Sequence, residues 1–147
     1  MKRTLAHSGT ALAALMHWYP LRDEVATFLG ERLTTLFAHA VSTETDCLIC
    51  STFFRRVLID QGENPDDLSL DPRERAVVDY GLALSRGNAF VSDAVYQEVA
   101  RQLSAPHLVT LTAFGAMMIA TNVFNNALEV DLDEYLHAYR RSGGVKA

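Results

Sequence analysis

Residues 32–61 read RLTTLFAHAVSTETDCLICSTFFRRVLIDQ and carry the strongest structural signal in the chain. Two apolar-rich segments flank a short polar turn and a Cys-x-x-Cys motif formed by Cys47 and Cys50. The pattern predicts two helices joined by the turn, with the cysteines at the N-terminus of the second helix. Because residues three apart share one face of a helix, the two thiols are expected to lie side by side.

Outside this stretch, helix start and stop signals are frequent and strand alternation is almost absent. Residues 71–74 (DPRE) place an Asp at the N-cap, a Pro at the first helical position and a Glu that completes a capping box. In the first half of the chain we expect helices over about 9–19 and 21–42, separated by Pro20 and with Gly30 as a weak point of the second, and a helix from Asp46 or Cys47 to Gln61 that stops at Gly62. In the second half we expect a helix over 72–86 with Gly87 as its left-handed cap, and helices over 93–103 and 105–128 capped by Ser92 and Ser104. Asp131 and Glu134 repeat the capping box and predict a last short helix.

Length and composition bound the class of protein. A chain of 147 residues buries about 68–70% of its unfolded surface as one domain and needs no disulfide scaffold. The net charge of -5 and the lack of a basic cluster argue against a nucleic-acid partner. Polar residues interrupt the N-terminal apolar stretch, so it fails as a signal peptide, and the apolar run 108–120 is shorter than the ~20 residues that span a bilayer.

These observations predict a cytoplasmic all-α protein, with residues 1–147 forming one bundle of about six or seven helices and with no membrane partner. The expected helix over 105–128 differs from the others because its middle, LTAFGAMMIA, is apolar on nearly every face. Burial on all sides requires either a central position in the subunit or an interface between subunits. Gly115 and the alanines around it would let another helix approach closely, and both interpretations stay open.

The Cys-x-x-Cys pair has several possible chemistries. A thiol at a helix N-terminus is acidified by unpaired N–H groups and by the helix dipole, so the pair can alternate between dithiol and disulfide. Glu44 and Asp46 act in the opposite direction, because ionised carboxylates beside Cys47 raise its pKa. The alternatives are two small core hydrophobes, or a zinc site for which the pair supplies only half of a tetrahedral ligand set, with His39 outside any suitable spacing. No metal ion and no cofactor is expected.

Residues 32–61, together with 70–86 (LDPRERAVVDYGLALSR) and 104–130, resemble the carboxymuconolactone decarboxylase superfamily, and within it the AhpD-like (alkylhydroperoxidase-like) branch. The resemblance covers residues from about 10 to 130. It implies an all-α subunit that forms a homo-oligomer, a trimer or a multiple of it. It also implies that the pair reduces a peroxide or exchanges with a dithiol or disulfide partner protein, with Cys50 attacking the peroxide and Cys47 resolving the sulfenic acid.

The chain departs from the family at its proton relay. The relay Glu lies twelve residues before the first cysteine, where this chain has Thr35, and the relay His lies four residues after the second, where it has Phe54. A further His, between the cysteines in the founding type, is Ile49 here. Because the thiolate is the attacking species, loss of a base weakens turnover, and such a base typically contributes about 10²–10⁴-fold.

Other residues are candidates for auxiliary roles. His39 lies one turn along the same predicted helix face as the first relay position, where it either acts as a substitute base or simply packs. Glu44, three residues before Cys47, either assists the cysteines or faces solvent. Asn122, Asn125 and Asn126 either form hydrogen bonds at the helix end or line the pocket near the cysteines.

The sequence thus predicts a thiol–disulfide redox protein of weakened activity, with a peroxide or other small molecule as substrate and a redox partner protein. The alternative is a non-enzymatic member of the same superfamily, an oligomeric scaffold or a small-ligand binder. The residues alone do not decide whether the chain is an enzyme.

Overall fold

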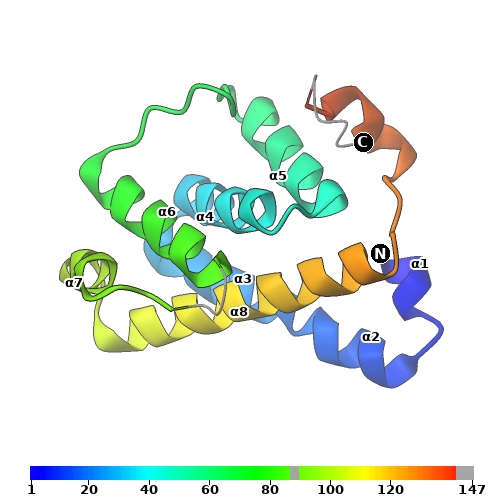
Figure 1. The fold of residues 1–147 in the computed structure, drawn as a ribbon, viewed down its shortest axis with the longest axis horizontal. Coiled ribbons are helices and arrows are strands. Elements are labelled where there is room, and N and C mark those ends of the chain that lie inside the picture. The colour runs from blue at the N-terminus through cyan, green and yellow to red at the C-terminus, as the bar shows by residue number, and fades with distance from the viewer. Residues whose placement is uncertain (87–89, 142–147) are drawn as a thin grey trace.

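The computed structural model describes residues 1–86 and 90–141, and the regular structure within those ranges is entirely helical (Figure 1). The all-α fold class is therefore confirmed, with more helices than the six or seven expected. The bounds are α1 Lys2–Leu5, α2 Gly9–Met16, α3 Trp18–Leu29, α4 Glu31–Glu44, α5 Leu48–Asp60, α6 Pro72–Ser85, α7 Asp93–Gln102, α8 Ala105–Ala127 and a 3-10 helix η1, Glu134–Tyr139.

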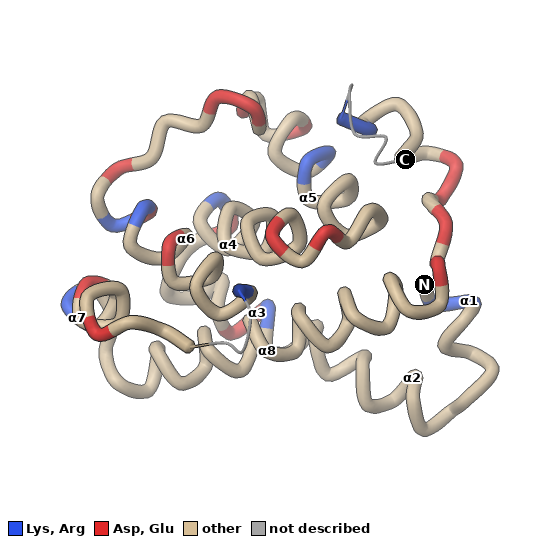
Figure 2. Tube along the Cα trace, in the orientation of Figure 1, with Lys and Arg blue, Asp and Glu red and all other residues tan. Residues whose placement is uncertain are grey.

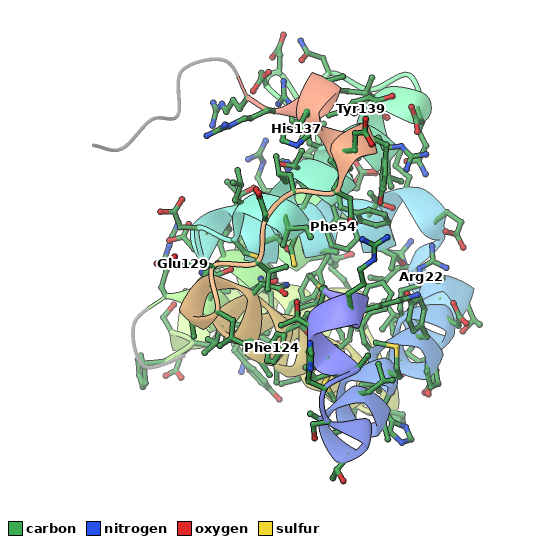
Figure 3. All side chains as sticks on the ribbon, turned by 90° about the vertical axis from the view of Figure 1, so that its right-hand side faces the viewer. Arg22, Phe54, Phe124, Glu129, His137 and Tyr139 are labelled. Atoms are coloured by element: carbon green, nitrogen blue, oxygen red, sulfur yellow. The ribbon has the colours of Figure 1, made fainter. Side chains whose placement is uncertain are left out.

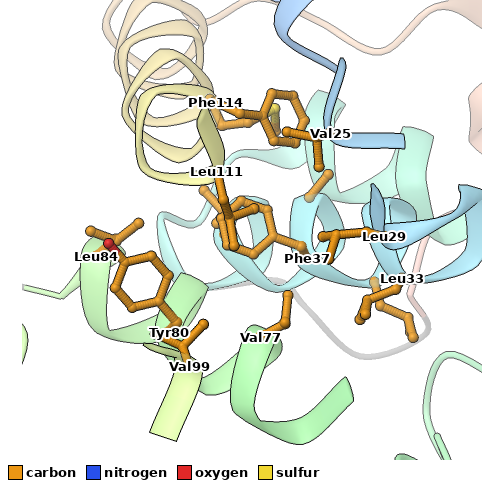
Figure 4. Close-up of a cluster of buried hydrophobic side chains, with 14 of the residues drawn as sticks. Val25, Leu29, Leu33, Phe37, Val77, Tyr80, Leu84, Val99, Leu111 and Phe114 are labelled. Carbon is orange, nitrogen blue, oxygen red and sulfur yellow. The ribbon is translucent and has the colours of Figure 1, made fainter. Parts of the chain in front are cut away.

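Helix α4 lies at the centre of the bundle and packs against α3, α5, α6 and α8 (Figure 1). Helix α8 is the longest and contacts α3, α4 and α6 along its length. The rings of Phe37 on α4 and Phe114 on α8 are fully buried and stack with their centroids 5.9 Å apart. Figure 4 shows the side chains that surround them, which come from α3, α4, α6, α7 and α8: Val25, Leu29, Leu33, Val77, Tyr80, Leu84, Val99 and Leu111.

Two glycines let α6 and α8 approach the Phe37 ring. A Cβ at Gly81 would lie 2.9 Å from Cδ2 of that ring, and a Cβ at Gly115 would lie 3.1 Å from its Cζ. The close approach expected at Gly115 therefore occurs inside the subunit, where the glycine makes room for an aromatic ring.

The prediction of one helix over 21–42 is wrong, because the chain breaks at Gly30. Gly30 has φ +80° and ψ 163°, a conformation that side chains with a Cβ rarely adopt. Its N–H still donates to the carbonyl oxygen of Ala26, and its own carbonyl accepts from the N–H of Thr34. Gly30 therefore ends α3 and starts α4 without leaving either group unpaired.

Pro20 does not separate two helices as predicted. It lies in the first turn of α3, which begins at Trp18, while α2 already ends at Met16. The first N–H groups of a helix have no partner within it, so a proline is tolerated there.

The capping box at the start of α6 is confirmed. Asp71 Oδ1 accepts from the N–H of Glu74 at 2.8 Å, and Glu74 Oε2 accepts from the N–H of Asp71 at 3.0 Å. Ser92 and Ser104 cap α7 and α8 as predicted. Gly87, the predicted cap at the end of α6, lies outside the described residues.

The predicted capping box of the last helix is wrong. Asp131 Oδ1 accepts from the N–H of Leu132, the adjacent residue, and so caps no helix. The last element is a 3-10 helix that begins at Glu134, three residues further on, and its N-cap Asp133 makes no side-chain cap hydrogen bond.

Within one subunit helix α8 is not buried on every side, so the alternative of a fully central position is wrong, while the alternative of an interface between subunits stays a prediction. Leu111 and Phe114 face the core, whereas Val109 and Val123 are 69% and 59% exposed. No Lys, Arg, Asp or Glu lies on α8 (Figure 2). By length and composition alone its 23 residues are enough to cross a membrane, so the length argument from the apolar run 108–120 does not hold. In the described part of the chain α8 packs against five other helices, α3, α4, α5, α6 and α7.

Candidate functional site

Cys47 and Cys50 lie at the start of α5, as the sequence predicts, and both thiols are free. Cys47 is the N-cap residue, with extended backbone angles, and its carbonyl accepts the first helical hydrogen bond from the N–H of Ser51. The helix itself starts at Leu48, one residue after the later of the two predicted starts, and Asp46 holds a positive φ of 53° in the turn that precedes it.

The two thiols differ in access. Cys47 is 0% exposed and packs against Leu132 and Leu136 of the segment that follows α8. Cys50 is half-buried and lines a pocket of about 450 Å³. A small molecule therefore reaches the sulfur of Cys50 and not that of Cys47.

The pocket is lined mainly by apolar side chains from three parts of the chain: the N-terminal helices, α5, and the end of α8 with the segment that follows it. Figure 3 looks toward this side of the molecule, where the N-terminal helices, the end of α8 and η1 come together, and Phe54 lies between them. Lys2, Arg3 and Asp133 are the charged residues of the lining. The apolar wall includes Leu15, Trp18, Ile49, Phe53, Phe54 and Met118.

The two thiols hydrogen-bond to each other, and this contact separates their pKa values. The pKa of Cys47 is lowered from 9.0 to about 7 by the hydrogen bond from Cys50 and by the backbone N–H groups of Cys50 and Ile49, against the opposing effect of burial. The pKa of Cys50 is raised by its hydrogen bond to Cys47 and by burial. The first proton to leave the pair therefore leaves Cys47.

The expected effect of the neighbouring carboxylates on Cys47 is not seen. Neither Glu44 nor Asp46 is among the main causes of the shift of the Cys47 pKa. Glu44 instead forms an ion pair with Arg86, with Oε1 and Nε 2.9 Å apart. The hydrogen bond from Cys50 is thus the largest influence that lowers the pKa of this thiol, ahead of the backbone N–H groups at the helix start.

Asn125 joins the two sulfurs from α8. Its Nδ2 lies 3.2 Å from Sγ of Cys50 and 3.9 Å from Sγ of Cys47, and its hydrogen bonds lower the pKa of both thiols. Asn125 is 2% exposed and also lines the pocket. Asn122 and Asn126 donate instead to Thr45, so they connect α8 to the turn between α4 and α5.

His39 is not brought to the thiols. Burial and the nearby charge of Arg55 lower its pKa to about 4, so the imidazole is neutral at pH 7. The other charged groups that act on it are Asp66 and Arg141, and neither they nor His39 line the pocket of Cys50.

Thr35 and Phe54, the two positions that carry the relay in the resembling family, come together in space. Both are buried and line a second cavity of about 250 Å³, which shares Trp18 and Phe53 with the pocket of Cys50. The Thr35 hydroxyl donates to the carbonyl oxygen of Glu31 within its own helix. A hydroxyl engaged in this way and a phenyl ring cannot take a proton from a thiol at neutral pH.

A metal site is not assembled in the part of the chain that the structure describes, since no group of three or more His, Cys, Asp or Glu side chains lies close enough to hold an ion. What the described residues do assemble is an acidified thiol at a helix N-terminus, a second thiol open to an apolar pocket, and an amide that contacts both. This arrangement is suited to thiol–disulfide chemistry.

Comparison with known proteins agrees with an AhpD-like helical bundle as the fold of this chain. No family model and no curated protein matches the chain. A solved structure does: a protein of unknown function from Agrobacterium tumefaciens, which its description suggests to be the antioxidant defence protein AhpD. The TM-score is 0.72 at 15% identity, over 88% of this chain and 95% of that one, which shows that the two share a fold.

Proposed function

We propose that the chain is a thiol–disulfide redox protein that reduces an organic hydroperoxide through Cys50 and Cys47. The observation that carries this proposal is the placement of Cys50 on an apolar pocket while its hydrogen-bond partner, the acidified Cys47, lies beneath the surface. The AhpD-like fold supports the proposal, and the loss of the family's relay positions, Thr35 and Phe54, predicts a slow reaction.

The reaction begins from the pair with one proton. The proton passes from Cys50 to the Cys47 thiolate, and the Cys50 thiolate attacks the terminal oxygen of the hydroperoxide. The O–O bond breaks, the alkoxide takes the proton from Cys47, and Cys50 carries a sulfenic acid. The Cys47 thiolate then attacks that sulfur and releases hydroxide, so that two thiol sulfurs are oxidised to a disulfide and the hydroperoxide is reduced to an alcohol. A dithiol, small or on a partner protein, restores the pair.

The first test is oxidation of the reduced protein by cumene hydroperoxide, an apolar hydroperoxide, followed by a free-thiol count and an intact mass. The expected result is loss of both thiols together and a mass lower by two hydrogens, with a rate that rises with pH through about 7 as the pair ionises. The scaffold or ligand-binder alternative predicts thiols that persist at a many-fold excess of peroxide. That outcome would exclude the redox function.

We also propose that the chain forms a homo-oligomer, a trimer or a multiple of it. This part of the proposal rests on a separate observation, the exposed face of α8. Val109 and Val123 are exposed on α8, and small residues at 113, 116 and 120 lie between them at spacings of three and four. These positions form one uncharged face of the helix (Figure 2), and a second copy of the subunit is the occupant we propose for it.

Ala116→Glu is expected to weaken self-association by about 100-fold. At the interface between two copies the introduced carboxylates would either repel one another or be buried without water, and both effects oppose association. Analytical ultracentrifugation of the wild type and the variant measures the effect. Ala94→Glu, on the exposed side of α7, is the matched control and should leave the oligomer intact. A wild-type protein that sediments as a monomer at high concentration would contradict this part of the proposal.

A further inference from the structure

The amide of Asn125 has two edges with different surroundings. Its Nδ2 edge contacts both sulfurs, at 3.2 Å from Cys50 and 3.9 Å from Cys47. Its Oδ1 is buried and has no hydrogen-bond partner. The nitrogen edge thus faces the reacting thiols, while the oxygen edge of the same group is unsatisfied.

An unpaired buried acceptor is costly unless something else supplies a donor. Asn125 is 2% exposed, so bulk water does not reach it freely, but the residue lines the pocket onto which Cys50 opens. A molecule in this pocket that carries an O–H group would provide the missing donor next to the sulfur.

Other polar side chains line the described pocket, among them the hydroxyls of Tyr19 and Tyr135, but the hydrogen bonds to the two cysteine sulfurs come from Asn125. The lining contains no His and no Glu, and its acidic residue, Asp133, lies at the N-cap of η1, on the segment that follows α8. Thr121 also lines the pocket, but its hydroxyl donates to the carbonyl oxygen of Met117 in its own helix. The amide of Asn125 is therefore the neutral polar group of the lining that meets the cysteine sulfurs.

We infer that Asn125 is a bifunctional hydrogen-bonding residue of the site: its Nδ2–H stabilises the thiolate, and its Oδ1 accepts the O–H of the hydroperoxide that Cys50 attacks. This inference rests on the proposed redox function for its second half only. With the O–H held by Oδ1, the terminal oxygen of the hydroperoxide lies next to the sulfur held by Nδ2. The amide takes no proton itself and positions the two reacting atoms.

The thiolate half is tested by the pH dependence of alkylation with iodoacetamide. Asn125→Leu should raise the apparent thiol pKa by about one unit, which lowers the thiolate fraction near neutral pH by up to tenfold. Asn125→Asp keeps the size of the side chain, remains informative if the Leu variant fails to fold, and should raise the pKa further because a carboxylate faces the sulfur. Asn126→Leu is the matched control, since Asn126 bonds to the Thr45 carbonyl and not to sulfur.

The substrate half is tested by comparing two oxidants on the same proteins. An aromatic disulfide reagent has no O–H, so its rate should fall only with the thiolate fraction. The rate with cumene hydroperoxide should fall about tenfold further in Asn125→Leu. Equal loss toward both oxidants would overturn the acceptor role, and an alkylation profile that matches the wild type would overturn the donor role.

The two oxidants also separate this inference from the proposed function. A wild-type protein that is inert to hydroperoxide removes the redox function and the acceptor role with it. The alkylation profile still decides the donor role, because it requires only the thiols and Asn125.

Discussion

The Cys50→Ser variant is expected to react with hydroperoxide no faster than the uncatalysed background, whereas Cys47→Ser should stop at a sulfenic acid on Cys50. The reason is access: Cys50 lines the pocket and Cys47 is 0% exposed beneath Leu132 and Leu136. Without Cys50 the remaining thiol is acidified but shielded. Without Cys47 the attacking sulfur of Cys50 is still present, but it reacts more slowly because its proton acceptor is gone. No second thiol is then available to convert the sulfenic acid into a disulfide.

Intact mass after peroxide treatment, with and without a sulfenic-acid trapping reagent, distinguishes the two variants. Ser51→Ala is the matched control, since Ser51 lies on the same helix turn, outside the pocket lining, and bonds within its own helix. A trapped sulfenic acid in Cys50→Ser together with an inert Cys47→Ser would reverse the roles assigned to the two cysteines.

Phe37→Ala is expected to lower the free energy of unfolding by about 3–5 kcal/mol, the usual cost of emptying a fully buried aromatic site. The ring is 0% exposed, stacks on Phe114 and fills the space between Gly81 and Gly115. Because α4, α6 and α8 meet at this ring, the cavity cannot close without moving a helix. Urea denaturation of the reduced protein measures the loss.

A variant at Gly115 tests whether this glycine is needed to make room for the Phe37 ring. Gly115→Ala places a Cβ 2.9 Å from Leu84 Cδ1 and 3.1 Å from Phe37 Cζ and should cost about 1–3 kcal/mol. Phe37→Leu removes Cζ, so the double variant should be more stable than the sum of the two single losses predicts, by at least about 0.5 kcal/mol. Strict additivity would show that the Phe37 ring is not what limits position 115.

Much of the fold could be predicted from the sequence because its signals are local. The capping box of Asp71 and Glu74 and the serine caps depend on residues three apart, and they place α6, α7 and α8 correctly. Gly30 carries a local signal too, but a glycine within an apolar periodic stretch is compatible with a weak helix, and only its positive φ shows the break. Helix α1 is too short for any periodicity, so its contribution to the pocket was missed.

The site was harder to predict because its parts are distant in sequence. The cysteine pair is a local motif, and its position at a helix start follows from the residues around it. Asn125 reaches the sulfurs from 75 residues further on, and the three asparagines near the end of α8 carry no signal that separates this one from the other two. Residues of the C-terminal segment cover Cys47 through packing that periodicity does not report.

The burial of Cys47 has a consequence for the return half of a redox cycle. In a disulfide formed between these two residues, an incoming dithiol would meet the sulfur of Cys50, because Leu132 and Leu136 close off the other side. Thiol–disulfide exchange is faster when the departing thiol is the more acidic one, and here that thiol is Cys47. Electrons would therefore enter and leave through a single sulfur, and the mixed disulfide with any reductant would form on Cys50.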